Sequence, residues 1–321
     1  MNRLYVPVGI ECIEPDMFPD VALYLKSGSN FVLYKNHGRD FSARDSERLK
    51  ENNVEFLFVS PGDMEAITEF MENNAERLLK SEKINNKLKG KMMYQTTVNF
   101  VGDIFSNPEK VGDFERSKRL MKNLLNYISS DSSALTSLET VMSHNYPTFV
   151  HSLQVTTLSL LIHSEAYLLA RDEMLDVGMG TLLHDFGKIF IPKEILNKTS
   201  KLNESEIAII KRHPEEGYQY LKENTQLSEV SLAIVRCHHE RINGNGYPFG
   251  LKGQDIPRSA QIGGMCDVYC NLAVDRSGRK ALPPGMIIHV MKQEMKGAFN
   301  ERLLDILETI TCVENQAQLI F

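Results

Sequence analysis

The chain has 321 residues, of which 42% are hydrophobic and 24% charged, and this composition excludes a wholly disordered protein. Its length allows one large domain or two ordinary ones, each with its own core. The formal net charge of −6 argues against duplex DNA or RNA as a partner, because nucleic-acid binders are usually basic. A small anionic ligand stays compatible with this charge, since it needs only a local cationic site.

No apolar run approaches the roughly 20 residues that span a bilayer, and the start of the chain lacks the apolar segment of a secretory signal. We therefore expect a cytoplasmic protein without a membrane span. The five cysteines include no Cys-x-x-Cys pair, which argues against a disulfide framework and against a structural zinc site.

The beginning of the chain has the patterns of a small α/β (α+β) domain. Short apolar runs predict strands at 4–10, 21–25, 31–34 and 54–59. The turn sequence KSGSN predicts that the second and third strands form a hairpin, and apolar residues at helical spacing follow over 64–80. Nothing here has catalytic spacing, so we interpret residues 1–95 as a regulatory or interaction domain. A protein partner or a second copy of the chain could bind through it.

The character of the sequence changes beyond this domain. We interpret residues 96–130 as a linker with a connecting helix, and residues 131–321 as an all-helical catalytic domain. The predicted fold class is therefore mainly α, with a small α/β part at the N-terminus. Amphipathic patterns predict helices at 149–169, 173–183, 204–212, 228–237, 259–272, 284–296 and 301–310.

Histidines and aspartates in the C-terminal part have the pattern of a metal site. A charged residue inside an apolar helix, such as Asp267 in QIGGMCDVYC, is costly to bury without a partner, and a metal ion supplies one. Imidazole and carboxylate together suit iron, manganese, zinc or nickel. The candidates are too many for one ion and fit two ions that share a carboxylate. These candidate ligands are His151, His184, Asp185, His213, His238, His239 and Asp267.

Single histidines have a simpler interpretation. A lone histidine in an apolar helix is usually a hydrogen-bonded core residue, and we interpret His163 and His289 in this way. Only the ordered set H…HDxGK…HP…HHE…GYP…D is specific.

The segment from His151 to about Lys280 resembles the HD-GYP family, a branch of the HD-domain metal phosphohydrolases. The matching text is LLHDFGKIFIPKEILNKTSKLNESEIAIIKRHPEEGYQYL, followed by HHERINGNGYPFGLKGQDIP. The resemblance implies an all-helical fold and a non-haem metal centre that is usually iron. It also implies hydrolysis of cyclic di-GMP to linear pGpG or on to GMP, by a hydroxide that two metal ions activate.

The same resemblance implies roles for individual residues. The first ion would be held by His151, His184, Asp185 and Asp267. Asp185 would bridge to the second ion, which would be completed by His213, His238 and His239. Asp185 and Lys188 would be the catalytic residues. Substrate would be bound by Lys188, Gly246, Tyr247, Pro248, Arg276 and Arg279, the arginines being suited to phosphate by their planar fork.

Three positions depart from the family's pattern. Some members hold a third ion with a Glu four residues before the first His, where this chain has Pro147, so we expect two ions. Cys270 replaces a usual Asp, and Gly278 lies in a segment that reads Arg-Ser-Gly-Arg instead of Arg-Pro-Tyr-Arg. Among nearby carboxylates, only Glu139 and Glu240 are candidates for a third ion.

These departures leave other functions open. The chain could be a receptor that binds cyclic di-GMP, hydrolyses it poorly and signals through its N-terminal domain. It could be a different HD-type phosphohydrolase that acts on nucleotides, although the GYP loop argues against this. Within the phosphodiesterase interpretation, a mixed cyclic dinucleotide is an alternative substrate.

Overall fold

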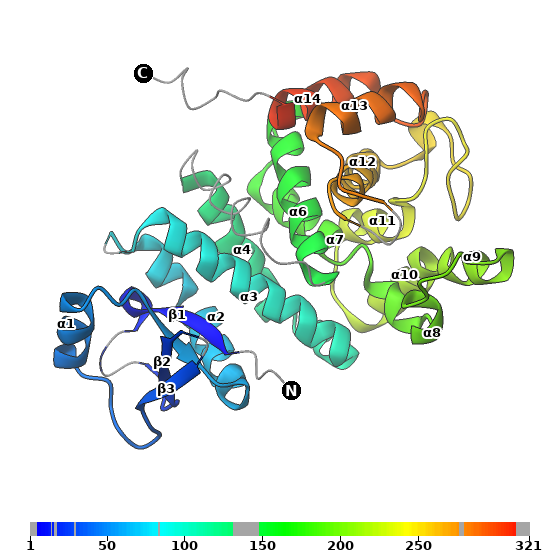
Figure 1. The fold of residues 1–321 in the computed structure, drawn as a ribbon. Coiled ribbons are helices and arrows are strands. Elements are labelled where there is room, and N and C mark those ends of the chain that lie inside the picture. The colour runs from blue at the N-terminus through cyan, green and yellow to red at the C-terminus, as the bar shows by residue number, and fades with distance from the viewer. Residues whose placement is uncertain are drawn as a thin grey trace, which may run out of the picture. The chain divides into compact units, whose positions relative to one another are not determined.

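The structure, a computed structural model, describes residues 5–130, 148–275 and 279–312, apart from residues 14, 16, 17, 29 and 83 (Figure 1). The chain divides into two compact units, one of residues 1–99 and 126–141 and the other of residues 100–125 and 142–321. A small sheet near the N-terminus and helices beyond it confirm the predicted fold class. None of the described helices is both long and apolar enough to cross a membrane.

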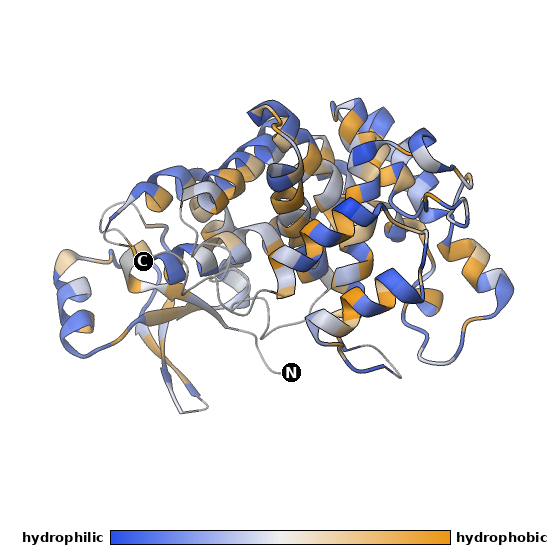
Figure 2. Ribbon diagram, turned by 90° about the horizontal axis from the view of Figure 1, so that it is seen from above, coloured by the Kyte–Doolittle hydropathy of each residue, from blue (hydrophilic) through white to orange (hydrophobic). Residues whose placement is uncertain are grey.

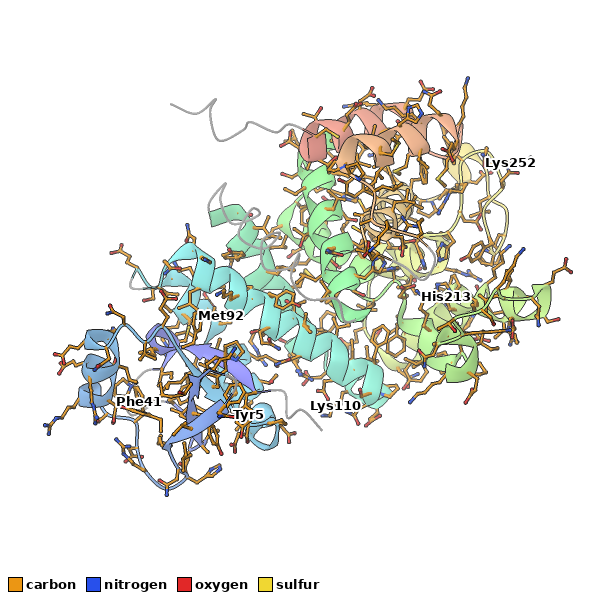
Figure 3. All side chains as sticks on the ribbon, viewed as in Figure 1. Tyr5, Phe41, Met92, Lys110, His213 and Lys252 are labelled. Atoms are coloured by element: carbon orange, nitrogen blue, oxygen red, sulfur yellow. The ribbon has the colours of Figure 1, made fainter. Side chains whose placement is uncertain are left out.

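The first unit contains a four-stranded antiparallel sheet with the strand order β1-β4-β2-β3. Its strands are β1 (Val6–Gly9), β2 (Leu23–Ser27), β3 (Asn30–Lys35) and β4 (Phe56–Val59). β2 and β3 form the hairpin that the KSGSN turn predicts. Two helices, α1 (Ala43–Glu51) and α2 (Met64–Lys80), pack their apolar residues into a common core with the sheet. Phe41 and Met92, both labelled in Figure 3, belong to this core.

The first unit also contains a helix that the sequence does not predict in full. Helix α3 (Asn86–Ser106) has 21 residues and covers a segment whose polar composition predicts a connecting region with helical parts. Its threonines Thr96 and Thr97 are buried, and each hydroxyl donates to the carbonyl oxygen one turn earlier. Because the helix itself satisfies these hydroxyls, they can be buried without another partner. α3 continues into the second unit, and α4 (Phe114–Ser130) follows it.

The second unit is helical. Beyond α4 its helices are α6 (Thr148–Ala166), α7 (Arg171–Leu182), α8 (Lys193–Leu196), α9 (Glu204–Ile210), α10 (His213–Asn224), α11 (Glu229–Cys237), α12 (Arg258–Leu272), α13 (Pro284–Gln293) and α14 (Glu301–Cys312). α6 packs against α7 and α12, while α11 packs against α7, α10 and α12. Several helices in Figure 2 show hydrophobic residues along one side and hydrophilic residues along the other. The apolar sides form the core of the unit.

Helix α10 is a second difference from the sequence prediction. Its sequence HPEEGYQYLKEN contains Pro214 and Gly217, which indicate a break when read alone. Pro214 is in the first turn, where its missing N–H costs no hydrogen bond. Gly217 is buried against Gly187, so a residue that weakens the helix serves a close contact.

Glycines hold the backbones of the second unit unusually close together. A Cβ atom on Gly187 would lie 1.9 Å from the carbonyl oxygen of His213, and one on Gly264 would lie 2.0 Å from that of His238. Both distances are far below van der Waals contact, so only glycine fits at these two positions. The contacts fix α10 and α11 against the segments that carry the remaining site residues.

Candidate metal centre

The seven candidate ligands come from five helices of the second unit or from the residues that follow them. His184 and Asp185 follow the end of α7, and His213 is the first residue of α10. The pair His238 and His239 follows α11. The remaining two lie within helices, His151 in α6 and Asp267 in α12.

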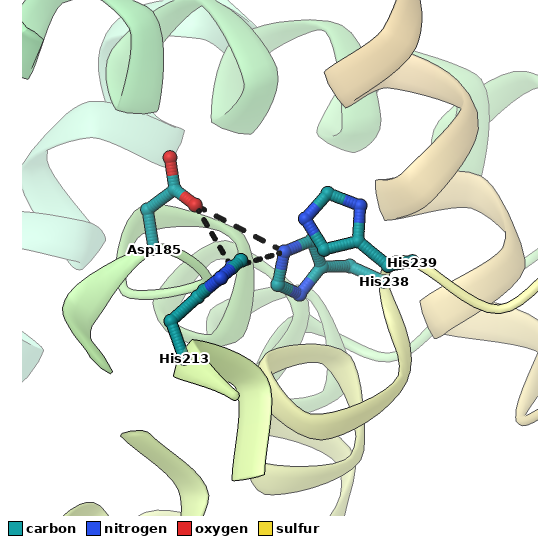
Figure 4. A group of neighbouring side chains, drawn as sticks. All are labelled: Asp185, His213, His238 and His239. Atoms are coloured by element: carbon teal, nitrogen blue, oxygen red, sulfur yellow. Dashed lines mark hydrogen bonds and ion pairs between the residues drawn. The ribbon is translucent and has the colours of Figure 1, made fainter. Parts of the chain in front are cut away.

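The ligand atoms form two groups that share Asp185. In the first group, atoms of Asp185, His213, His238 and His239 all lie within 4.8 Å of one another (Figure 4). The second group meets the same limit and consists of His151, His184 and Asp185. Oδ1 of Asp185 lies 3.4 Å from His213 Nε2, whereas Oδ2 lies 3.4 Å from His184 Nε2. Each carboxylate oxygen therefore faces one group, as a bridging ligand requires.

Asp267 also lies between the two groups. Its Oδ1 atom is 2.9 Å from His151 Nε2 and 3.8 Å from His184 Nε2, while Oδ2 is 3.9 Å from His239 Nδ1. The resemblance assigns Asp267 to the first ion alone. The side-chain amide of Asn271, one helical turn later in α12, donates to the same Oδ1 atom at 2.7 Å.

The backbone sets the orientation of three imidazole rings. The Nδ1 atoms of His184, His213 and His238 each lie 2.7–2.9 Å from the carbonyl oxygen three residues earlier. Because a carbonyl only accepts, each Nδ1 carries the proton, and Nε2 is left to face the cluster. Among the described residues, the buried Nε2 atom of His184 has no hydrogen-bond partner. The Nε2 atoms of His213 and His238 lie only 3.3 Å apart.

The rings of His213 and His238 place lone pairs opposite each other in a buried site. Two imidazole acceptors repel each other at this distance unless a cation lies between them. A divalent metal ion relieves this repulsion, satisfies His184 Nε2 and offsets the two aspartate charges. The donor set, nitrogen with carboxylate oxygen, therefore fits iron, manganese, nickel or zinc.

Burial and the neighbouring charges shift the ligand pKa values in opposite directions. Burial lowers the pKa of His239 to about 3, and burial with the adjacent His239 holds the pKa of His238 well below its usual range. Burial also opposes the charged form of His184, but Asp185 and Asp267 outweigh it and raise its pKa to about 10. The two carboxylates therefore favour a positive charge on the His184 ring, whereas burial favours neutral rings at His238 and His239.

A search with protein-family models matches residues 128–303 to the HD domain. The chain belongs to the HD domain family. Curated relatives include cyclic di-GMP phosphodiesterase PA4108 of Pseudomonas aeruginosa, 35% identical over 172 residues, which are 53% of this chain and 41% of that protein. The response regulator RpfG of Xanthomonas campestris, also named a cyclic di-GMP phosphodiesterase, is 36% identical over 43% of this chain and 37% of its own.

A third relative, 3'3'-cGAMP-specific phosphodiesterase 2 of Vibrio cholerae, is 31% identical over 64% of this chain and 37% of its own length. The chain spans about two fifths of the length of these relatives. Among solved structures, one described as Bd1817, a HDG"Y"P protein from Bdellovibrio bacteriovorus, has the same fold. Its TM-score is 0.68 at 20% identity, and the match covers 96% of this chain and 99% of that one.

The GYP loop of this HD domain is stacked against a candidate ligand. The ring of Tyr247 lies on that of His239, with centroids 4.5 Å apart and 23° between the planes. The backbone N–H of Tyr247 donates to the carbonyl oxygen of His239 at 3.2 Å. A Cβ atom on Gly246 would lie 2.4 Å from the backbone nitrogen of Arg241, so the loop approaches the His-His segment too closely for another residue. Pro248 follows Tyr247 and is exposed.

Glu240 holds the GYP loop through hydrogen bonds to its backbone. Its side chain is buried, and its two oxygens accept hydrogen bonds from the backbone N–H groups of Phe249 at 2.7 Å and Leu251 at 2.9 Å. The sequence indicates this carboxylate as a candidate ligand for a third ion. In the structure it holds the loop that carries Tyr247, which leaves both oxygens committed to backbone donors.

The predicted substrate cations differ in their surroundings. Lys188 forms an ion pair with Asp185 beside the shared carboxylate. Arg279 instead donates to the carbonyl oxygens of Asn271, Leu272 and Val274 at the end of α12. Its assignment to substrate phosphate stays a prediction that this geometry does not favour. Arg276, Gly278, Glu139 and Pro147 lie outside the described residues.

Two further histidines test the simpler interpretation. His163 is buried, and its Nδ1 lies 2.7 Å from the carbonyl oxygen of Ser159, which confirms it as a hydrogen-bonded core residue. His289 is exposed, so its prediction as a core residue is wrong. α13 buries Ile287, Ile288 and Met291, and a residue at this phase of the helix faces away from that side.

Sequence reasoning missed two supporting residues. Asn271 donates to Asp267, and the half-buried guanidinium of Arg241 donates to the carbonyl oxygens of His238 and Glu240. The i to i+4 spacing of Asp267 and Asn271 on a predicted helix is a signal that could have found the first. Arg241 follows the HHE sequence directly, but its inward course has no sequence signature.

Proposed function

We propose that this chain is a metal-dependent phosphodiesterase that hydrolyses a cyclic dinucleotide, with cyclic di-GMP as the substrate and pGpG or GMP as the product. The observation that carries the proposal is the division of Asp185 between two groups of imidazoles. Two ions that share a carboxylate are a common device for cleaving phosphoesters. The names of the curated relatives support the substrate class.

Divalent ions bound here would supply Lewis acidity toward phosphate oxygens and would make a hydroxide available near neutral pH. The chain's own residues prepare the site for them. His151, His184 and Asp267 would hold one ion, His213, His238 and His239 the other, and Asp185 both. Lys188 places a positive charge beside Asp185, where it can offset charge on a substrate phosphate. Tyr247 stacks on His239 and limits the directions in which that ring can move.

Iron is our first choice of metal, because the family resemblance implies it, and manganese, nickel and zinc fit the same ligands. We test metal and reaction together. The protein is prepared with oxygen excluded, loaded with iron or manganese, and incubated with cyclic di-GMP or cyclic GMP-AMP before chromatography. We expect two ions per chain and a linear product from cyclic di-GMP. A folded, metal-loaded protein that leaves both nucleotides intact would contradict the proposal.

A receptor is the second candidate, and the surroundings of Arg279 are the observation that favours it. This arginine is tied to backbone carbonyls, and Cys270, at the position of a usual Asp, is buried in an apolar cluster. Both features reduce the number of polar groups available to a substrate. Tight binding of cyclic di-GMP without a product in the same assay would support the receptor.

A further inference from the structure

Tyr247 contacts both a candidate metal ligand and an exposed cation. One contact of its ring is with His239, at 4.5 Å between centroids, and another is with the Nζ atom of Lys211, 5.2 Å from the ring centroid. Lys211 caps the end of α9 and precedes His213 by two residues. The ring of Tyr247 thus contacts both the exposed Lys211 and a residue of the metal cluster.

Five other described cations of the second unit are engaged. Their partners within the described part of the chain are Asp185 for Lys188, Glu216 for Arg212, Glu215 for Arg236, and backbone carbonyls for Arg241 and Arg279. Lys211 is exposed and forms no ion pair with any described residue. Its charge is therefore available to an anionic ligand that reaches the Tyr247 side of the cluster.

A cyclic dinucleotide carries two phosphates, and only one of them can be cleaved at the metal cluster at a time. We propose that Lys211 binds the second, uncleaved phosphate, with the ring of Tyr247 holding the ammonium group in place. This inference rests on the proposed function. Lys211 contacts the same ring that stacks on His239, so its charge lies close to the metal cluster. A lysine acts on phosphate as a point charge, and cation–π contact with the ring limits its freedom.

The test compares a substrate with two phosphates and one with a single phosphodiester. Lys211→Gln, Lys211→Arg and the parent protein are loaded with manganese, and KM and kcat are measured on cyclic di-GMP and on bis(p-nitrophenyl) phosphate. We expect Lys211→Gln to lower kcat/KM for cyclic di-GMP, divided by kcat/KM for bis(p-nitrophenyl) phosphate, by about tenfold. The reason is that one charged hydrogen bond is lost with the larger substrate only. The loss should lie in KM, and Lys211→Arg should restore most of it. The KM of the parent protein should also rise more steeply with salt than that of Lys211→Gln.

Arg212→Gln is the matched control, because it removes the same charge from the adjacent exposed position, where Glu216 already pairs with it. We expect it to leave the ratio unchanged. Equal losses on both substrates, or an unchanged ratio in Lys211→Gln, would overturn the role of Lys211 while the proposed function stands. A parent protein that cleaves bis(p-nitrophenyl) phosphate but neither binds nor cleaves a cyclic dinucleotide would overturn both.

Discussion

The two units differ in whether their buried charged groups are neutralised by partners within the chain. In the first unit, Lys35 is 3% exposed and donates to Asp20 and to the carbonyl oxygen of Val21. Asp45 accepts from Ser42 and Tyr34 and pairs with Arg39. Each of these charges has an opposite charge supplied by the chain. Burial is therefore compensated within the unit, and the contacts are structural.

In the second unit the balance is incomplete. Asp185 and Asp267 are buried among imidazoles whose ring nitrogens face inward, and Lys188 is the cation that pairs with Asp185. Imidazole lone pairs 3.3 Å apart do not satisfy each other. A buried polar cluster that the chain leaves unsatisfied indicates an external cation, whereas one that it satisfies does not. The following predictions test this difference, from the largest effect to the smallest.

Replacing the shared carboxylate should abolish the centre. Asp185→Ala removes the one ligand common to both groups, so we expect loss of bound metal and of phosphodiesterase activity to background. Elemental analysis and the chromatographic assay measure both. Circular dichroism checks that the variant is folded. Full metal content in a folded Asp185→Ala protein would remove Asp185 from the site.

Removing the hydrogen bond behind Asp267 should weaken the centre without emptying it. Asn271→Leu keeps the size of the side chain but leaves Oδ1 of Asp267 without its amide donor. We expect the affinity for manganese to fall by about tenfold, as outer-shell partners of metal ligands typically contribute. Metal titration with a competing chelator measures the change. An affinity equal to that of the parent protein would show that the hydrogen bond does not orient the ligand.

Asp45 in the first unit should contribute stability and no metal. Asp45→Ala removes the acceptor for Ser42, Tyr34 and Arg39, and we expect the free energy of unfolding to fall by about 1–3 kcal/mol. Metal content should stay unchanged. Denaturant unfolding followed by near-ultraviolet circular dichroism, with elemental analysis, measures both. A loss of metal would show that the two clusters are not independent.

The same carboxylate predicts a dependence of stability on pH. Burial opposes its charged form, but hydrogen bonds from Ser42 outweigh burial and lower the pKa of Asp45 from 3.8 to about 2. The folded state thus binds the proton less tightly than the unfolded state does. This stability is fully present above about pH 4 and is lost as pH falls through about 2. Asp45→Asn should flatten the unfolding free energy over this range relative to the parent protein, and equal slopes would contradict the shift.

Tyr247→Phe should have a small effect. The ring that covers His239 and faces Lys211 is kept, and only the hydroxyl is removed. We expect both metal ions to remain and kcat/KM to change by less than about tenfold, the scale of one hydrogen bond. Loss of an ion would instead place the hydroxyl among the ligands.

Removing residues 1–85 should have the smallest effect on the centre. All candidate ligands lie in the second unit, and this shortening keeps α3 and α4 whole. We propose that the removed part serves regulation or interaction, so metal content per folded chain should be unchanged. A folded but metal-free product would show that the centre depends on the first unit.

Features that depend on local sequence alone, such as a turn or the periodicity of one helix, could be predicted from the sequence. The KSGSN turn with its flanking apolar runs predicts the β2–β3 hairpin, and helix α2 occupies the 64–80 segment that its periodicity predicts. The ordered His and Asp pattern predicts seven candidate ligands, and the structure places all seven in one cluster. Helix α3 was not predicted in full because residues such as Thr96 and Thr97 are buried on it, which removes the contrast between faces.

Other features depend on the course of the chain in space. A guanidinium can bind backbone carbonyls as well as phosphate, and Arg279 donates to carbonyl oxygens at the end of α12. The sequence places Glu240 beside two histidines but does not show that its oxygens turn toward Phe249 and Leu251. Such choices follow from packing and not from local spacing.

The glycine contacts at Gly187 and Gly264 have a genetic consequence. The smallest possible mutation there adds one methyl group, yet that group would overlap the carbonyl oxygens of His213 and His238. The backbones would have to separate, and with them the imidazoles that the same residues carry. A screen for inactive variants should therefore recover Gly187→Ala and Gly264→Ala beside changes in the histidines. Two glycines, which have no reactive group, would then be as sensitive to substitution as the metal ligands.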